Sequence, residues 1–253
     1  MRCPTPTGSG RSRRRPSRRS SPDLITSASN ARLRLVRRLA SRRQREKEGL
    51  FVVEGEDLVE AARAEGIEPV ELLVAGENVT AELLASVSGL PHPSRVIGIF
   101  RREDLPGGAL PTGLALWHVS DPGNVGTLLR TADAFGPASV ALSAGCADPT
   151  GLKALRASAG AIFRVPTAHF DDAARPRVAL VAGAGTAVDE LEPGDVTFVL
   201  GAEREGLPDD VVRACDAVAS IPQAASAESL NVAVAGAVAL YERRRQSASA
   251  PGA

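Results

Sequence analysis

Aromatic residues, cysteine and lysine are scarce in this chain, and long apolar runs are missing. Aromatic residues make up 3% of the 253 positions, and Trp and Tyr occur once each. Cys3, Cys146 and Cys215 have no CxxC spacing, and none of the three histidines forms a ligand cluster with them. This argues against a metal site and a disulfide framework, and no apolar run reaches the length of a membrane span. We therefore expect a cytoplasmic protein with no metal and no membrane partner.

The charge is unevenly distributed, although the formal net charge is zero. Residues 1–50 contain fourteen Arg and one Lys against three acidic residues, a local excess of twelve positive charges. Such an asymmetry indicates a polyanionic partner for the N-terminal part. Lysine occurs only at positions 47 and 153, so the arginine content is also typical of a GC-rich genome, which weakens an argument from arginine count alone.

Residues 1–23 are rich in Arg, Ser and Pro, and we expect a disordered basic extension. The segment has no apolar core of a secretory signal. Its composition resembles an organellar transit peptide as well as a disordered bacterial extension, and we favour the extension.

A basic amphipathic helix is expected over residues 30–39, and the positive charge continues into an expected loop up to Lys47. Leu33, Val36 and Leu39 mark its apolar face. A solvated helix face accounts for this pattern. Because the basic run continues from a helix into a loop before a folded unit, RNA contact is favoured slightly. The candidate RNA-binding residues here are Arg32, Arg37, Arg42, Arg43 and Arg45.

The next segment alternates short apolar runs with helical patterns. Strands are expected over 50–54, 69–76 and 95–100, and helices over 56–64 and 80–86. This predicts a small α/β domain over residues 24–102. The Pro- and Gly-rich residues 103–112 are expected to be a linker.

Residues 113–245 continue the alternation, followed by a disordered tail over 246–253. The expected elements are strands over 114–120, 139–144, 161–166 and 177–183, with helices over 125–134 and 151–160. This order predicts an open parallel sheet covered by helices. Asn124, at the start of one helix, and Arg130, about one and a half turns later, are both expected to reach the mouth of the sheet.

One glycine pair in this domain imitates a dinucleotide-binding motif. Gly183 and Gly185 directly follow a strand, but the third glycine is missing and position 188 is Val. A true motif usually lies at the first strand of its domain. We therefore reject NAD binding.

The run from Phe198 to Arg245 contains the candidate site. Two loops follow two predicted strands, and ligands collect at the carboxyl ends of parallel strands. The final helix, expected to open at Ser229, is apolar around nearly its whole circumference. Such a helix is buried on all sides. Either it is a core helix, or it packs one face on its own sheet and the other on a partner subunit.

Three separated blocks resemble the SpoU family of S-adenosylmethionine-dependent RNA 2′-O-ribose methyltransferases, within the SPOUT class. The first is Asn124-x-Gly126-x-x-x-Arg130, and the second is LGAEREGL at 200–207. The third is IPQAASAESLNVAVAGAVALYE at 221–242. The N-terminal unit, with FVVEG at 51–55, is similar to the small ribosomal-protein-like substrate-binding domain of rRNA-directed members.

The resemblance implies a deep trefoil knot, an S-adenosylmethionine pocket formed by the knot loops, and an obligate homodimer with the site near its interface. It implies catalytic roles for Asn124, Arg130, Glu203, Ser229 and Asn231, and RNA contact by Arg130. The implied cofactor-binding residues are Leu200, Gly201, Glu203, Gly206, Ile221, Pro222, Gln223, Ser229 and Leu230.

Several roles stay open. Arg130 would stabilise a developing alkoxide, since a guanidinium is a poor base. Glu203 would hold either Arg130 or a backbone donor of a loop. Ser229 would cap the last helix or act in the site, and Asn231 needs a buried partner. Gln223 and Ala225 depart from the Met and Gly that the family usually has, so cofactor affinity is expected to be reduced.

Together these features predict methyl transfer to a ribose 2′-hydroxyl of RNA, with large-subunit rRNA as the expected substrate. A tRNA-directed enzyme is the alternative within the same class. A non-catalytic RNA-binding or assembly protein that keeps the fold is the alternative outside it, because Gln223 and Ala225 depart from the family pattern.

Overall fold

A computed structural model describes residues 24–224, 226 and 229–249 of the chain. The predicted extension at 1–23, Ala225 and the last four residues of the predicted tail lie outside the described part.

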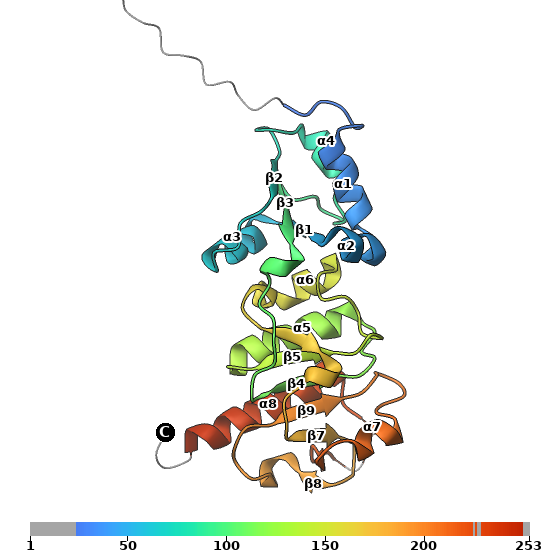
Figure 1. The fold of residues 1–253 in the computed structure, drawn as a ribbon, viewed down its shortest axis with the longest axis vertical. Helices are drawn as coiled ribbons and strands as arrows, with labels where there is room; N and C mark the ends of the chain where they lie inside the picture. Colours follow the sequence, from blue (N-terminus) through green and yellow to red (C-terminus); the bar gives the residue numbers. More distant parts are fainter. Residues whose placement is uncertain (1–23, 225, 227–228, 250–253) are drawn as a thin grey trace, which may run out of the picture.

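The N-terminal unit is a three-stranded antiparallel sheet with helices around it (Figure 1). Asn30 caps the first helix by accepting a hydrogen bond from the Arg32 backbone N–H at 2.9 Å. The strand order is β1-β3-β2. Its elements are α1 (Ala31–Leu39), α2 (Arg42–Glu48), β1 (Leu50–Glu54), α3 (Glu56–Ala64), β2 (Glu71–Val74), α4 (Ala81–Ala85) and β3 (Val96–Arg101). The loop expected after residue 41 was wrong, because α2 forms there.

The C-terminal unit is built on a seven-stranded sheet in which every pairing is parallel, as predicted. The strand order is β6-β5-β4-β9-β7-β10-β8. The strands are β4 (Gly113–Leu116), β5 (Ser139–Leu142), β6 (Thr167–His169), β7 (Arg177–Leu180), β8 (Thr186–Ala187), β9 (Thr197–Leu200) and β10 (Ala217–Ser220). The α-helices are α5 (Pro122–Phe135), α6 (Leu152–Ser158), α7 (Asp209–Arg213) and α8 (Val232–Ser249). Its 3-10 turns are η2 (Ala161–Phe163), η3 (Phe170–Asp172) and η4 (Val188–Glu190), while η1 (Arg102–Asp104) directly follows β3 of the N-terminal unit.

Alternate residues of the central strands feed two cores, one on each face of this sheet. Leu114 of β4 and Phe198 of β9 pack in the core that also contains residues of α5, α6 and α8. Their neighbours Ala115 and Val199 pack with Val211 of α7 on the other face. The result is a helix–sheet–helix arrangement with the carboxyl ends of all strands at one edge.

Three element predictions in the C-terminal unit were also wrong. The segment 161–166 is not a strand, because its first half forms η2 and the strand β6 follows at Thr167. The last helix opens at Val232 rather than Ser229. It continues to Ser249, so the predicted tail is helical over its first four residues.

The two units share one continuous core. Phe100 of β3 packs against Phe51 of β1 and Phe163 of η2, with ring centroids 5.9 and 6.1 Å apart. Figure 1 shows α6 between the N-terminal sheet and the rest of the C-terminal unit. Buried aromatic packing of this kind disfavours independent motion. The N-terminal sheet is therefore packed against the C-terminal unit and is not connected to it by the chain alone.

Candidate active site

A pocket of about 220 Å³ lies at the carboxyl edge of the sheet, beyond the ends of β7, β9 and β10. The strands β9 and β10 do not pair with each other, because β7 lies between them. Every predicted cofactor-binding residue except Pro222 lines the pocket: Leu200, Gly201, Glu203, Gly206, Ile221, Gln223, Ser229 and Leu230. The two loops expected to form one site therefore do so from either side of an intervening strand.

The loop after β7 also lines this pocket, and the sequence analysis missed it. Leu180, Val181 and Ala182 contribute to the wall. They directly precede the Gly183 and Gly185 pair that was considered only as a dinucleotide motif. The position of a strand within a parallel sheet, here between β9 and β10, is not readable from a local pattern, although it decides which loops meet.

Three polar side chains meet beside the pocket. Asn124, in the first turn of α5, donates from its Nδ2 to Glu203 Oε1 at 3.1 Å. Its Oδ1 accepts a hydrogen bond from Asn231 Nδ2 at 3.2 Å. Asn124 is thus the bridge between the loop after β9 and the start of α8, and it is the catalytic-site partner predicted for Asn231. The expected burial was wrong, because Asn231 is exposed and Asn124 is half-buried.

Asn231 also caps α8. Its Oδ1 accepts from the backbone N–H groups of Ala233 and Val234, at 2.9 and 3.3 Å. This satisfies two donors at the helix start that have no partner within the helix. Of the two roles left open for Ser229, the helix cap is therefore not formed. Ser229 is an exposed residue of the pocket wall instead.

Glu203 holds the loop that follows β4. Its carboxylate accepts from the backbone N–H groups of Ser120 and Asp121, at 3.3 and 3.1 Å, in addition to the Asn124 amide. Partial burial opposes ionisation, but these hydrogen bonds outweigh it and lower the pKa of Glu203. Glu203 is therefore an anion at neutral pH and a poor proton acceptor, and it organises the site.

Arg130 does not join this group. It is exposed on α5, and no hydrogen bond or ion pair links it to any residue in the described part of the chain. Of the two roles expected for Glu203, holding a loop backbone donor is confirmed, and a contact with Arg130 is not formed.

The pocket fits an adenosyl cofactor. Apolar side chains of Leu180, Ile221 and Leu230 suit an adenine ring. Gln223 Oε1 is buried without a hydrogen-bond partner among the described residues, so it is available to a polar ligand. A Cβ at Gly201 would lie only 2.2 Å from the Gly206 carbonyl carbon, so the loop can close this tightly only with glycine there.

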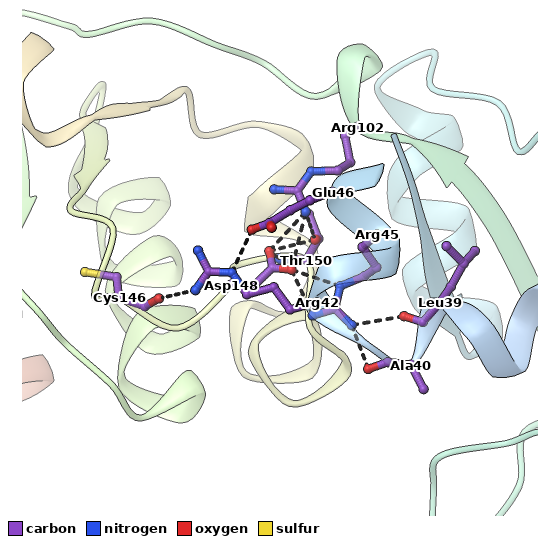
Figure 2. Close-up of polar contacts among 9 residues, drawn as sticks. All are labelled: Leu39, Ala40, Arg42, Arg45, Glu46, Arg102, Cys146, Asp148 and Thr150. Carbon is purple, nitrogen blue, oxygen red and sulfur yellow. Dashed lines mark hydrogen bonds and ion pairs between the residues drawn. The ribbon is translucent and has the colours of Figure 1, made fainter. Parts of the chain in front are cut away.

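The predicted RNA-binding arginines of the N-terminal unit divide into two groups. Arg45 is 7% exposed and forms an ion pair with Asp148 at 2.8 Å, so its prediction as an RNA contact was wrong (Figure 2). Arg42 donates to Glu46 and to the Cys146 carbonyl oxygen, both at 2.8 Å, but its side chain is 47% exposed, so its role in RNA binding stays a prediction.

The remaining arginines lie at the surface. Arg32 pairs with Glu71 at 3.1 Å, and Arg37 donates to the Ala28 carbonyl at 2.9 Å. Arg43 is exposed on α2. These three side chains keep access to solvent, and their role in RNA binding stays a prediction.

The sheet is parallel and has a ligand pocket at its carboxyl edge, with the Asn124, Glu203 and Asn231 side chains beside it. This arrangement is typical of an α/β enzyme that binds a cofactor at the ends of its strands. Residues 111–241 match the SpoU rRNA Methylase family, and residues 30–97 match the MRM3-like substrate binding domain. The chain belongs to the SpoU rRNA methylase family. It is an RNA methyltransferase that uses S-adenosylmethionine, so the predicted family, fold class, activity and cofactor are confirmed.

Relatives match over nearly the full chain. A tRNA/rRNA methyltransferase of Synechocystis, itself uncharacterized, is 34% identical over 90% of this chain and 96% of its own length. The Bacillus subtilis 23S rRNA (guanosine(2553)-2′-O)-methyltransferase RlmP is 29% identical over 87% of this chain and 98% of its own. An S-adenosylmethionine-bound rRNA methyltransferase of Sinorhizobium meliloti has a TM-score of 0.77 at 29% identity, covering 88% of this chain and 97% of that one.

Two features are absent from the described part of the chain. No helix among them is long and apolar enough to cross a membrane. No group of three or more His, Cys, Asp or Glu side chains among them is placed to hold a metal ion.

Proposed function

We propose that this enzyme transfers a methyl group from S-adenosylmethionine to a ribose 2′-hydroxyl of large-subunit rRNA in the cytoplasm. The observation that carries the proposal is the Glu203–Asn124–Asn231 group beside the pocket. Its amides are fixed by hydrogen bonds, and a sugar hydroxyl needs such preorganised partners. The similarity to an enzyme named for 2′-O-methylation of 23S rRNA supports the choice of acceptor.

In this mechanism the cofactor supplies the activated methyl group, and the chain supplies binding and orientation. Gly201, Ile221, Gln223 and Leu230 would hold it. Asn124 and Asn231 would orient the acceptor ribose. Glu203, already ionised, keeps the Asn124 amide in one orientation.

Arg130 would act through its charge. A guanidinium next to the acceptor oxygen stabilises the negative charge that develops as the hydroxyl loses its proton. Because Arg130 has no protein partner in the described part of the chain, its side chain is available to the RNA or to a second subunit.

We infer that the enzyme works as a homodimer and that its C-terminal unit contains the trefoil knot of the SPOUT class. Leu230, Val234 and Tyr241 support the dimer, because they are 38%, 48% and 53% exposed around the start and middle of α8. Large apolar side chains exposed together are typical of an interaction surface.

The test is methyl transfer from radiolabelled cofactor to total RNA, followed by mapping of 2′-O-methyl positions. Label in 23S-type rRNA with wild-type protein, and its loss with Arg130→Ala, is the expected result. Label confined to tRNA would replace the substrate assignment. Folded wild-type protein that transfers no label to any RNA would favour a binding or assembly protein, for which the Gln223 departure is the motivation.

A further inference from the structure

The two units of the chain are joined by a buried charge cluster centred on Asp148. Asp148 follows β5 in the C-terminal unit, and the side chain is 4% exposed. Arg45 of α2 donates to its Oδ2 from Nε at 2.9 Å and lies 2.8 Å away through Nη2. Arg102, directly after β3, approaches both carboxylate oxygens at 3.3 Å (Figure 2). One carboxylate of the C-terminal unit thus receives two arginines of the N-terminal unit.

Every group of this cluster is satisfied. Thr150 donates from its backbone N–H and its hydroxyl to Asp148 Oδ1, at 2.9 and 2.7 Å. Arg45 Nη1 donates to the carbonyl oxygens of Leu39 and Ala40, at 3.0 and 2.9 Å. A buried ion pair adds little net stability when an apolar pair of similar size could replace it, but it is very costly to break from one side. Such a cluster therefore fixes one relative orientation of the two units.

The same loop also contacts the 117–121 loop, which Glu203 holds beside the pocket. The Ala147 N–H donates to the Val119 carbonyl at 2.9 Å, and Ser143 Oγ accepts from the His118 N–H at 2.9 Å. Val119 directly precedes Ser120, whose N–H is held by Glu203. Asp148 is therefore one residue away from a hydrogen bond to the loop that Glu203 organises.

We propose that Asp148 is a positioning residue for RNA methylation: it locks the N-terminal unit and the 117–121 loop into the one arrangement in which RNA bound to that unit reaches Asn124. This inference rests on the proposed function. It assigns to Arg45 and Arg102, in place of a phosphate contact, a role in holding the RNA-binding surface at a fixed place relative to the methyl donor.

The test compares full-length wild type with Asp148→Ala and Asp148→Asn. The matched control is Glu77→Gln, which removes an arginine-paired carboxylate within the N-terminal unit, 2.8 Å from Arg95 and exposed. We measure kcat and KM for an rRNA transcript, cofactor affinity by calorimetry and the radius of gyration by X-ray scattering. For Asp148→Ala the RNA KM should rise about tenfold or more and the radius of gyration should increase. The cofactor Kd should stay within about twofold.

Asp148→Asn keeps acceptors for Thr150, so it should fall between wild type and Asp148→Ala, while Glu77→Gln behaves as wild type. Unchanged KM, kcat and scattering in folded Asp148→Ala would overturn the inference, as would an equal loss of cofactor affinity. If Asp148→Ala does not fold, Arg102→Ala provides the same comparison, since Arg102 is 30% exposed at the edge of the cluster. Failure of the proposed function gives a different result, because the wild-type protein then transfers no methyl group to RNA. Scattering and cofactor binding would still measure the effect of Asp148→Ala on the arrangement of the two units.

Discussion

Asn124 is the residue on which the geometry of the site depends most, because it contacts Glu203 and Asn231 at once. Asn124→Ala removes both contacts. A hydrogen bond to a charged group contributes about 1.5–3 kcal/mol, so we expect kcat to fall about ten- to a hundredfold. Thr127→Ala, on the same helix, is the control because its hydroxyl only bonds the Gly123 carbonyl, at 2.8 Å. Steady-state kinetics with RNA and calorimetry with the cofactor measure the effect. A drop in cofactor affinity with unchanged kcat would contradict it.

Glu203 makes the stability of this loop sensitive to acid. Hydrogen bonds lower the pKa of Glu203 in spite of its partial burial. Ionised Glu203 therefore stabilises the folded state fully at pH values above its unfolded pKa of about 4.3. This stabilisation is lost as the pH falls through the lowered pKa of Glu203 in the folded state. In urea unfolding across acidic to neutral pH, wild type should lose stability on acidification more steeply than Glu203→Gln. Parallel curves would show that Glu203 does not contribute.

The sequence predicts which residues belong to the site better than it predicts which residues each of them contacts. Asn124, Glu203 and Asn231 stand in the blocks that resemble the family, and all three meet in the structure. Arg45 stands in RRQREKE, where every neighbour is polar, but in the structure it is buried and bonds to Asp148, 103 positions away. The same limit explains why Arg45 was predicted as an RNA contact: charge patterns do not report which charges are neutralised by tertiary contacts.

At the level of the elements, two residues near the start of α8 have different roles: Asn231 caps the helix, and Ser229 lines the pocket. Asn231→Ala should lower the free energy of unfolding by about 1 kcal/mol through loss of the helix cap, and it should also lower kcat. Ser229→Ala should leave stability unchanged and weaken cofactor binding, since Ser229 lines the pocket and does not cap. Denaturant unfolding and calorimetry on the same two variants give the comparison. A stability loss in Ser229→Ala would show that it caps the helix after all.

Strand and helix types were largely predictable, while their ends were not. The β1, β3 and β7 runs are apolar and short, and all three form strands as expected. AIFRVP has the same composition, but Ala161, Ile162 and Phe163 form a turn, in which Phe163 packs on Phe100. Tertiary packing of this kind overrides strand propensity. Likewise, Ser229 and Asn231 are both good caps, and sequence preference alone does not choose between them.

On the scale of the whole molecule, the contact with the N-terminal unit and the ligand pocket both lie at the carboxyl edge of the seven-stranded sheet. The cofactor pocket lies beyond β7, β9 and β10, and the Asp148 cluster lies beyond β5 in the same sheet. The loops after β4 and β9, joined by Glu203, connect these two regions. No local pattern predicts this order, because it follows from the strand arrangement β6-β5-β4-β9-β7-β10-β8. The parallel topology was predictable from the alternation of strands and helices, whereas the neighbours of each loop were not.

The remaining surface of α8 should be the interface with a second copy of the chain. Val234 and Tyr241 lie two helical turns apart and are about half exposed, and Tyr241 packs edge-on against Phe135 of α5 at 5.6 Å. Burying a charge in such an apolar interface without a partner is strongly unfavourable. We therefore expect Tyr241→Glu and Val234→Glu to convert a wild-type dimer into a folded monomer in light scattering coupled to gel filtration. Ser247→Glu, an exposed position elsewhere on α8, should remain dimeric. A wild-type monomer, or variants that stay dimeric, would place the interface elsewhere.

Arg130 has no partner within the described part of its own chain. If a second subunit completes the site, the monomeric variants should also lose activity while retaining cofactor affinity.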